Sequence, residues 1–209
     1  DMWIAYGNTL IYVASTTILM ILTSVTAAYP LVNNKLAGRK FLVAYLLIPM
    51  YFGGGMIPSF LLINRLGLYN TRLALIIPGA VGIWNIILTR TYFASLPGEL
   101  SEAAFIDGAG VGRTFFTIIY PMMKPIVSAV MIMDALWIWN DFQLPLLMLN
   151  ASQDMWTLPL FEYNFKNKYS TNYTLAFAAF LLSSLPILVF YLLAQKQIIN
   201  GLTTGAVKS

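Results

Sequence analysis

The sequence contains no cysteine and no histidine among its 209 residues, and only 10% of the residues are charged. The chain therefore has no disulfide and no thiolate nucleophile, and it lacks the commonest metal ligand and the commonest general acid–base group. A soluble domain carries about 25% charged residues. Low charge combined with a hydrophobic content of 59% indicates a membrane protein.

The main feature of the sequence is a series of long stretches with few charged residues. A helix needs about 20 apolar residues to cross a bilayer. Such stretches predict five spans, at 9–29, 41–64, 74–93, 126–149 and 174–194, with Pro30 ending the first. The fold class expected is an all-α integral membrane protein, a polytopic helical bundle with five visible spans.

The distribution of Lys and Arg predicts the orientation, because cytoplasmic connections carry an excess of both. One set of connections holds eight basic residues and the other holds four. The larger set is Lys35, Arg39, Lys40, Arg90, Arg113, Lys124, Lys196 and Lys208; the smaller is Arg65, Arg72, Lys166 and Lys168. We therefore expect the visible N-terminus outside, the C-terminus in the cytoplasm, and the connection at 96–122 in the cytoplasm.

A polar interruption at 102–121 reads EAAFIDGAGVGRTFFTIIYP. It predicts a short amphipathic helix at 102–106, a turn at Asp107-Gly108, and a second semi-apolar stretch that stops at Pro121. The pattern resembles the EAA loop of ABC-transporter permease subunits, of the form E-A-A-x-x-x-G, nine residues, then I-x-L-P. The matching positions are Glu102, Ala103, Ala104, Gly108, Ile118 and Pro121, and Tyr120 stands where the family usually has Leu.

Other segments extend this resemblance to nearly the whole chain. The I-D-G-A run at 106–109 is common in the sugar-importing branch, and W-N-D-F at 139–142 followed by L-P-L at 144–146 resembles the fifth-span signature of the maltose-type branch. The stretch 8–30 resembles the second span of a six-span permease, and 201–208 resembles that branch's tail. The resemblance implies one permease domain over 1–209 that lacks the family's first span, which fits the abrupt start at Asp1.

The resemblance also implies a function. It implies the transmembrane subunit of a bacterial ATP-driven ABC importer for a sugar or oligosaccharide, in the plasma (inner) membrane. The chain would not be an enzyme and would hold no cofactor or metal, because ATP and Mg would lie on partner subunits. Implied partners are a cytoplasmic ATP-binding subunit dimer, a second, paralogous permease, an extracellular solute-binding protein and the sugar, with no nucleic acid. The alternatives are a permease for another polar solute or an ion-gradient-driven secondary transporter.

The residues Glu102, Ala103, Ala104, Asp107 and Gly108 are expected to couple the chain to the ATPase. Small alanines let a partner surface approach the helix, and a carboxylate near a helix start is favourable with the dipole. Glycine permits the sharp turn that follows. The alternative is a surface helix that only links two spans. The glycine-rich run at 108–114 lacks the Lys and the preceding strand of a phosphate-binding loop, so no nucleotide is expected there.

Acidic residues in the fourth predicted span mark a candidate substrate path. At about 100° per residue, Asp134, Trp137 and Asp141 fall within roughly 60° of one helix face, with Asn140 at its edge. Ionisable groups at membrane depth usually face protein or a water-filled path. An aromatic ring with a carboxylate can hold a sugar. The alternative is an interhelical clamp, which we favour for Asp134 and weigh equally for Asp141; Trp139 is expected to contact lipid or to pack.

Three glycines and two prolines interrupt the second predicted span, at Gly53-Gly54-Gly55, Pro49 and Pro58. Such residues break a helix, and transporters use broken helices where the backbone lines a cavity. Gly54 is therefore a candidate residue of the substrate path. The alternative is a close helix crossing through small residues.

The topology can be tested directly because the chain has no cysteine of its own. Cysteines placed at Lys35, Lys166 and Lys208 would be treated in intact cells with an impermeant thiol reagent. We expect labelling at 166 and none at 35 or 208 until the membrane is opened. Labelling at 208 in intact cells without labelling at 166 would reverse the orientation.

Overall fold

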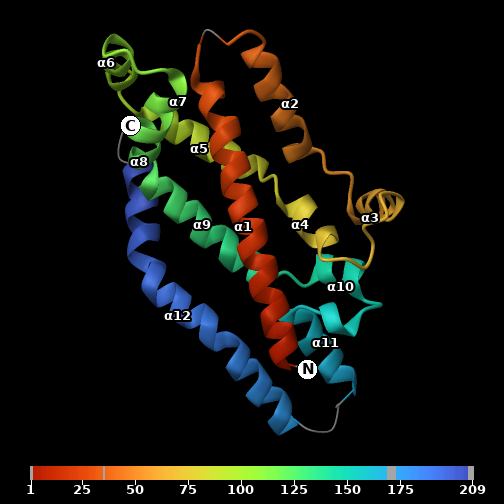
Figure 1. The fold of residues 1–209 in the computed structure, drawn as a ribbon. Coiled ribbons are helices and arrows are strands. Elements are labelled where there is room, and N and C mark those ends of the chain that lie inside the picture. Colours follow the sequence, from red (N-terminus) through yellow and green to blue (C-terminus); the bar gives the residue numbers. More distant parts are fainter. Residues whose placement is uncertain (1, 35, 169–172, 207–209) are drawn as a thin grey trace. The chain divides into compact units, whose positions relative to one another are not determined.

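The computed structural model describes residues 2–34, 36–168 and 173–206, and every regular element in these ranges is helical (Figure 1). The expected all-α class is thus confirmed. The elements are α1 (Met2–Val32), α2 (Arg39–Tyr51), α3 (Met56–Arg65), α4 (Leu73–Gly79), α5 (Ile83–Ser95), α6 (Glu99–Ile106), α7 (Val111–Thr114), a π-helix (Phe115–Ile119), α8 (Tyr120–Met122), α9 (Lys124–Trp139), α10 (Gln143–Leu149), a 3₁₀-helix (Gln153–Met155), α11 (Leu158–Lys168) and α12 (Tyr173–Ala206). Lys35 and Lys208, which the topology prediction uses, lie outside the described residues.

Several helices are long and apolar enough to cross a membrane. In the described ranges Met2–Val32 and Leu73–Ser95 qualify alone, and two bent helix pairs raise the number to four. The pairs are Arg39–Tyr51 with Met56–Arg65, and Val111–Met122 with Lys124–Trp139. Within α12 the apolar stretch Phe177–Val189 lies where the fifth span is predicted. These helices agree with a multi-pass membrane protein.

The first span is longer than predicted, and Pro30 does not end it. Helix α1 runs for 31 residues and contains Pro30 near its end. A proline lacks the N–H group and its ring conflicts with the carbonyl group four residues earlier, so it removes one helical hydrogen bond. In the last turn little helix remains to be disturbed, and the Pro30 carbonyl oxygen still accepts a hydrogen bond from the Asn33 N–H group at 3.1 Å.

The second and fourth predicted spans are each interrupted. The second divides at residues 52–55 into α2 and α3, and Gly55 there has a φ of 87°, a backbone conformation that glycine adopts readily. The expected break at the glycines is therefore observed. The fourth was predicted as one helix over 126–149, but α9 ends at Trp139 and α10 begins at Gln143. Between them, the Asp141 side chain accepts a hydrogen bond from a backbone N–H group at the start of α10.

The chain divides into two compact units, and each gathers segments that are far apart in sequence. The first unit holds Asp1–Met20, Phe52–Val81 and Met133–Ala194. The second holds Ile21–Tyr51, Gly82–Ile132 and Gln195–Ser209. The two units have separate hydrophobic cores.

The core of the first unit joins α1 to the short helices α4 and α10, which lie side by side (Figure 1). A backbone hydrogen bond from the Asn70 N–H group to the Met148 carbonyl oxygen, at 2.9 Å, ties the turn before α4 to the end of α10. The buried hydrophobic residues of this core are Tyr12, Ile63, Ala74, Leu75, Ile76, Ile138, Met148, Leu149 and Leu160.

The core of the second unit packs α5 and the segment after α7 against the C-terminal half of α1. Its centre is aromatic: the Tyr29 ring lies 4.7 Å from Phe115 and 5.6 Å from Phe93, measured between ring centroids. Two guanidinium groups close the end of α1, since Arg39 and Arg90 each donate through Nε to the Leu31 carbonyl oxygen, at 2.9 and 3.2 Å. Cations are favourable at a helix C-terminus, where carbonyl groups lack helical partners.

A close helix crossing exists, but it is not at the three glycines. A Cβ atom on Gly53 or Gly55 would meet nothing within 4 Å, whereas a Cβ atom on Gly79 of α4 would lie 2.6 Å from Cγ2 of Thr16 on α1. Thr16 is fully buried. Glycine at position 79 therefore allows the two helices to approach, because any side chain would collide with a stiff β-branched neighbour.

The crossing predicts a compensating pair of substitutions. Gly79→Ala should destabilise the protein by roughly 1–3 kcal/mol, the usual cost of overpacking. Adding Thr16→Ser, which removes the colliding methyl group, should restore most of that loss. Thermal unfolding of the purified protein in detergent would measure both. Gly7→Ala, at a helical position with open space, is the matched control; equal stability of the Gly79→Ala and Gly7→Ala variants would contradict the crossing.

Candidate functional site

The predicted coupling helix is present as α6, and it begins three residues earlier than expected, at Glu99. The earlier start places both Glu99 and Glu102 in the first turn. Carboxylates are favourable there because the helix N-terminus carries a partial positive charge. Ala104 is buried, whereas Ala103 and Glu102 are exposed, so the helix anchors through one face and presents the other.

The predicted turn at Asp107-Gly108 is also present, and it closes the end of α6. Gly108 has a φ of 77°, in the left-handed region that favours glycine. The N–H group of Asp107 donates to the Ala103 carbonyl oxygen at 3.0 Å, and the N–H group of Ala109 to that of Ala104 at 2.9 Å. These bonds resemble a helix C-cap built around a left-handed residue. They place the side chain of Asp107 outward, where it is exposed.

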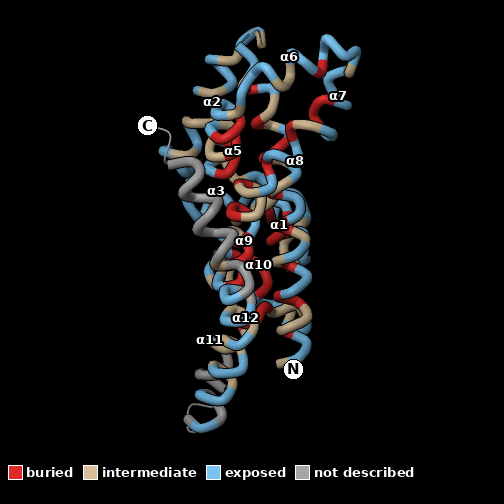
Figure 2. Tube along the Cα trace, turned by 90° about the vertical axis from the view of Figure 1, so that its left-hand side faces the viewer, coloured by how far each residue is buried: buried red, intermediate tan, exposed pale blue. Residues whose placement is uncertain are grey.

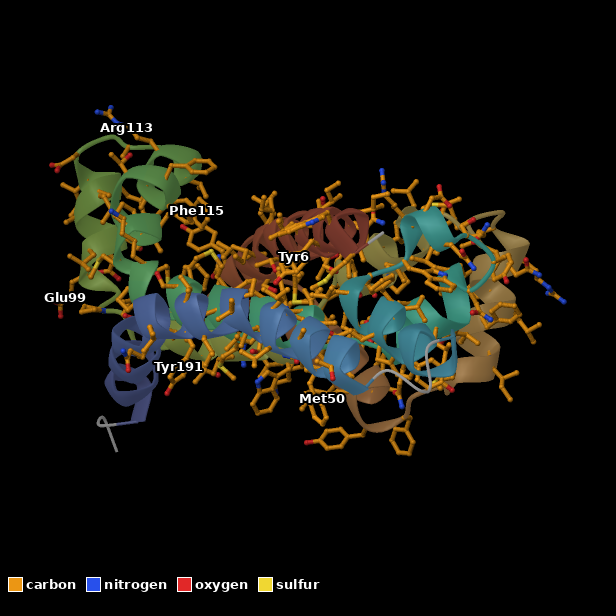
Figure 3. All side chains as sticks on the ribbon, turned by 90° about the horizontal axis from the view of Figure 1, so that it is seen from below. Tyr6, Met50, Glu99, Arg113, Phe115 and Tyr191 are labelled. Carbon is orange, nitrogen blue, oxygen red and sulfur yellow. The ribbon has the colours of Figure 1, made fainter. Side chains whose placement is uncertain are left out.

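The outer surface of this loop combines apolar and charged groups. Ile106 is 87% exposed and Val111 is 61% exposed, while Glu102 and Arg113 are also exposed. Figure 2 shows α6 and α7 mostly in the colour of exposed residues, and in Figure 3 Glu99 and Arg113 point away from the protein. Apolar groups ringed by charges suit a protein partner better than lipid, because the charges would have to leave water to enter a bilayer.

A π-helix connects this loop to the rest of the second unit, and no residue pattern predicts it. The semi-apolar stretch was expected to stop at Pro121, but helical structure continues through Met122, because proline is tolerated in the first turn of α8. Beyond it the path bends by 70° into α9. The Phe115 ring packs on Tyr29 at 4.7 Å, so the loop is fixed to α1 by an aromatic contact. π-Helical turns occur often at functional sites.

In the first unit, Asp141 lies in the break between α9 and α10 and accepts hydrogen bonds from α1 and α10. The Tyr12 hydroxyl group of α1 donates to Oδ2 at 3.0 Å, and the Leu144 N–H group of α10 donates to Oδ1 at 3.3 Å. The carboxylate thus caps α10 and joins it to α1, 129 residues earlier in the chain. This geometry favours the clamp interpretation at Asp141.

Asp141 does not share one helix face with Asp134 and Trp137, contrary to the prediction. The prediction assumed one continuous helix, but α9 ends at Trp139. Asp134 is half-buried on α9 and has a partner within the protein. Trp139 is buried beside Ala5 and Leu158, which confirms packing as its role.

An open hollow of about 560 Å³ lies at the break between α9 and α10. It brings together three predicted path residues, Trp137, Asn140 and Asp141, and adds Gln143. Trp137 is 68% exposed, and both amide side chains are exposed. Gly54 and Asp134 do not line this hollow. The Asn140 side-chain amide nitrogen donates to the Leu136 carbonyl oxygen at 2.8 Å, and the same oxygen also accepts from the Asn140 backbone N–H group at 3.3 Å.

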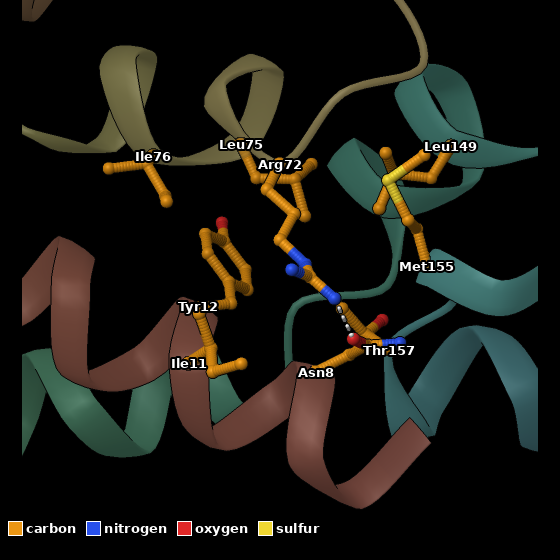
Figure 4. Close-up of a pocket in the computed structure, with 9 residues that line it drawn as sticks. All are labelled: Asn8, Ile11, Tyr12, Arg72, Leu75, Ile76, Leu149, Met155 and Thr157. Atoms are coloured by element: carbon orange, nitrogen blue, oxygen red, sulfur yellow. Dashed lines mark hydrogen bonds between the residues drawn. The ribbon is translucent and has the colours of Figure 1, made fainter. Parts of the chain in front are cut away.

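A second polar cluster, which the sequence analysis missed, surrounds Asn8 on α1 (Figure 4). Its amide nitrogen donates to the carbonyl oxygens of Asp154 and Trp156, at 2.7 and 3.2 Å, and its Oδ1 atom accepts from Arg72 at 3.0 Å. Asn8 is buried and lies one helical turn before Tyr12, so the two side chains lie on the same face of α1. The sequence pattern that could have indicated this cluster is the pair of polar side chains, Asn8 and Tyr12, four residues apart in an otherwise apolar span.

Two kinds of chemistry find no support in the described residues. The glycine-rich run at 108–114 follows α6 and ends in α7, so it has no strand of a phosphate-binding loop before it. Within the same ranges, no group of three or more His, Cys, Asp or Glu gathers in a way that could hold a metal ion.

Comparison with known proteins gives consistent matches over the length of the chain. Residues 3–201 match the family described as binding-protein-dependent transport system inner membrane component. The chain is 37% identical over 221 residues to the multiple sugar-binding transport system permease protein MsmG of Streptococcus mutans, covering 97% of this chain and 75% of that protein. It is 34% identical over 211 residues to the melibiose/raffinose/stachyose import permease protein MelC of Bacillus subtilis, covering 98% and 75%.

A solved structure is similar as well. A bacterial ABC transporter involved in the import of the acidic polysaccharide alginate matches with a TM-score of 0.84 and 28% identity, covering 93% of this chain and 74% of that chain. The chain thus spans about three quarters of the length of these proteins.

The contact between Tyr12 and Asp141 predicts coupled effects on stability. Tyr12→Phe and Asp141→Asn should each lower the unfolding temperature, because a hydrogen bond to a charged group contributes about 1.5–3 kcal/mol. Tyr12→Phe removes the bond and Asp141→Asn removes its charge, so both act on the same interaction, and the double variant should lose less than the sum of the single losses. Tyr69→Phe, whose ring packs on Phe60, is the control. Strictly additive losses in purified protein would show that the two groups do not act together.

Proposed function

Because the chain belongs to the family of binding-protein-dependent transport system inner membrane components, we propose that it is the transmembrane subunit of a bacterial ATP-driven importer of sugars or oligosaccharides. The printed names of its relatives support the substrate class, since they include sugar, arabinooligosaccharide and melibiose/raffinose/stachyose permeases. The chain itself performs no reaction. ATP and Mg are bound by partner subunits.

The observation that carries this proposal is the loop from α6 to Gly108. It is exposed, ends in a left-handed glycine turn and presents Ile106 and Val111 between charged residues. A cytoplasmic ATP-binding subunit with an apolar groove and a charged rim would fit such a surface. The charges would keep the loop out of the bilayer and set its register on the partner.

Motion of the partner reaches the spans through the second unit. Helix α6 contacts α7 and the π-helix, and Phe115 of the π-helix packs on Tyr29 of α1. Closure of the ATP-bound subunits would move α6 as a rigid body and pull on these contacts. The substrate path would then open alternately to the outside and to the cytoplasm.

The remaining partners follow from the same proposal. An extracellular solute-binding protein delivers the sugar, and a second, paralogous permease completes the path. Helix α2 has no buried residue, and Phe41 and Tyr51 on it are more than 70% exposed, so it faces lipid or that second permease. The visible N-terminus would lie outside and the C-terminus in the cytoplasm.

An ion-gradient-driven transporter is the weaker alternative. Such a transporter relays ions or protons through ionisable groups at membrane depth. The candidates in the predicted fourth span are Asp134, which has a partner within the protein, and Asp141, which is bonded to Tyr12 and Leu144. Engaged carboxylates are less suited to a relay.

The turn at Gly108 provides the test. Gly108→Val forces a β-branched residue to a φ of 77°, which costs on the order of 1–3 kcal/mol and would displace the turn. We expect sugar uptake by the assembled importer to be lost, while the amount of chain in the membrane stays unchanged.

Gly98→Ala is the matched control, because Gly98 lies at the other end of α6 with a φ of −64° and open space around it. This variant should transport normally. Normal uptake by Gly108→Val would rule out coupling through this turn.

A further inference from the structure

A small cavity in the first unit, here called the Thr157 cavity, combines hydrophobic and polar walls (Figure 4). Its volume is about 10 Å³, close to the roughly 10–15 Å³ that one water molecule needs. A sugar or a lipid tail does not fit into such a space. The hydrophobic walls come mainly from α1, α4 and α10, and the polar side chains that line the cavity are Asn8, Tyr12, Arg72 and Thr157.

The Thr157 hydroxyl group is buried in this cavity without a protein partner. Thr157 is 2% exposed, and its Oγ1 atom has no hydrogen-bond partner among the described residues. The residue stands directly before α11, where a hydroxyl group can cap a helix by accepting from the second or third N–H group. The second residue of α11 is Pro159, which has no N–H group. A hydroxyl group removed from water lowers stability unless another partner replaces the water.

Arg72 brings a positive charge and further donors to the same cavity. Figure 4 shows its guanidinium group reaching from the turn before α4 toward Asn8 and Thr157. One N–H group of Nη2 donates to the Asn8 Oδ1 atom at 3.0 Å. Arg72 is exposed as a residue, but Asn8 is buried, so this side of the guanidinium group faces inward. Because a guanidinium group has five N–H donors, it retains donors for a second partner.

Asn8 supplies an acceptor. Its amide nitrogen is engaged by the carbonyl oxygens of Asp154 and Trp156, at 2.7 and 3.2 Å. Its Oδ1 atom accepts from Arg72 and has a second lone pair. The cavity therefore gathers donors on Arg72, an acceptor on Asn8, and a hydroxyl group on Thr157 that can do either.

This set of groups matches the bonding pattern of one water molecule. Internal water molecules make about three hydrogen bonds, and they occupy polar cavities rather than apolar ones. We propose that the Thr157 cavity binds one structural water molecule, which accepts from Arg72 and donates to Thr157 Oγ1 and Asn8 Oδ1. The water molecule thereby fastens the turn before α4 and the start of α11 to α1.

A chloride ion is the main alternative occupant. It would be attracted by the Arg72 charge and could accept from the Thr157 hydroxyl group. It has no hydrogen to donate, however, so it would face the lone pairs of Asn8 Oδ1 without a bond. The Thr157 cavity shares no lining residue with the hollow at the end of α9, and its occupant does not depend on the proposed transport function.

A cryo-electron microscopy map of the assembled importer, at a resolution at which ordered water molecules are visible, tests the site directly. We expect one density peak in the cavity, within about 2.6–3.2 Å of Thr157 Oγ1 and of an Arg72 guanidinium nitrogen. A cavity without density, in a map that shows other buried water molecules, would overturn the proposal.

Thr157→Val tests the site by the direction of its effect on thermal unfolding, because valine keeps the shape of the side chain and removes the hydroxyl group. With a bound water molecule, the unfolding temperature should fall by about 2–4 °C, the effect of losing one hydrogen bond in a chain of this size. Without one, replacing an unbonded hydroxyl group by a methyl group leaves the temperature unchanged or raises it. That result would contradict the proposal.

Thr114→Val is the matched control. Thr114 is also fully buried, and its Oγ1 atom has no partner among the described residues, but it does not line the Thr157 cavity. Its replacement should leave the unfolding temperature unchanged or raise it. A fall equal to that of Thr157→Val would show that the loss does not come from the cavity, and the water site would be rejected.

A double-variant cycle shows whether Arg72 and Thr157 share the water molecule. Arg72→Met removes the guanidinium donors and keeps an unbranched side chain. If one water molecule bridges the two residues, the double variant should lose less than the sum of the single losses. Strictly additive losses would mean that Thr157 acts alone, as a cap of α11 would, and would overturn the bridge.

Replacing chloride by gluconate at constant ionic strength separates the two occupants. Gluconate is far too large for the cavity, whereas water is present in both buffers. The unfolding temperature of the wild type should be the same in both. A lower temperature in gluconate that is absent from the Thr157→Val variant would assign the site to chloride and refute the water molecule.

Discussion

Hydrocarbon offers no hydrogen-bond partner to a peptide group, so a chain that crosses a bilayer must satisfy its backbone from within. This constraint explains why all regular structure in the described residues is helical. It also makes the helix ends at membrane depth informative, because the backbone N–H and C=O groups freed there need other hydrogen-bond partners. At the end of α9, the Asn140 side chain adds a second hydrogen bond to the Leu136 carbonyl oxygen, and the Asp141 carboxylate accepts from a backbone N–H group at the N-terminus of α10.

The same constraint connects structure to function. A helix break costs free energy, but it exposes polar groups that a continuous helix would not present, and in this chain those groups line a hollow. The loop at 96–122, which we propose to lie in the cytoplasm, is subject to the opposite demand. It must be rigid enough to transmit force, and it gains this rigidity from the Gly108 turn and from the aromatic packing of Phe115 on Tyr29. Transport would require movement of the loop to change the shape of the hollow at the helix break.

Local patterns predicted the loop better than they predicted the broken span. The turn at Gly108 and the break at Gly53–Gly55 could be read from glycine and proline positions alone, because the backbone preferences of these residues are intrinsic. The break after Trp139 has a local signal as well, because Pro145 cannot bond the carbonyl group of residue 141. The contact of Asp141 with Tyr12 could not be predicted in this way, since Tyr12 is 129 residues away in sequence. The close approach of Gly79 to Thr16 and the π-helix likewise arise from packing between distant segments. Whether Gly54, Trp137 and Asp141 serve the substrate path stays a prediction.

ATP hydrolysis by the reconstituted complex tests the central claim most directly. The chain would be placed in lipid nanodiscs with its second permease and ATP-binding subunits, and the hydrolysis rate measured with and without sugar-loaded binding protein. The account predicts that the loaded binding protein stimulates hydrolysis and that the stimulation requires this chain. Sugar uptake that proceeds without ATP and collapses when the ion gradient is removed would contradict it.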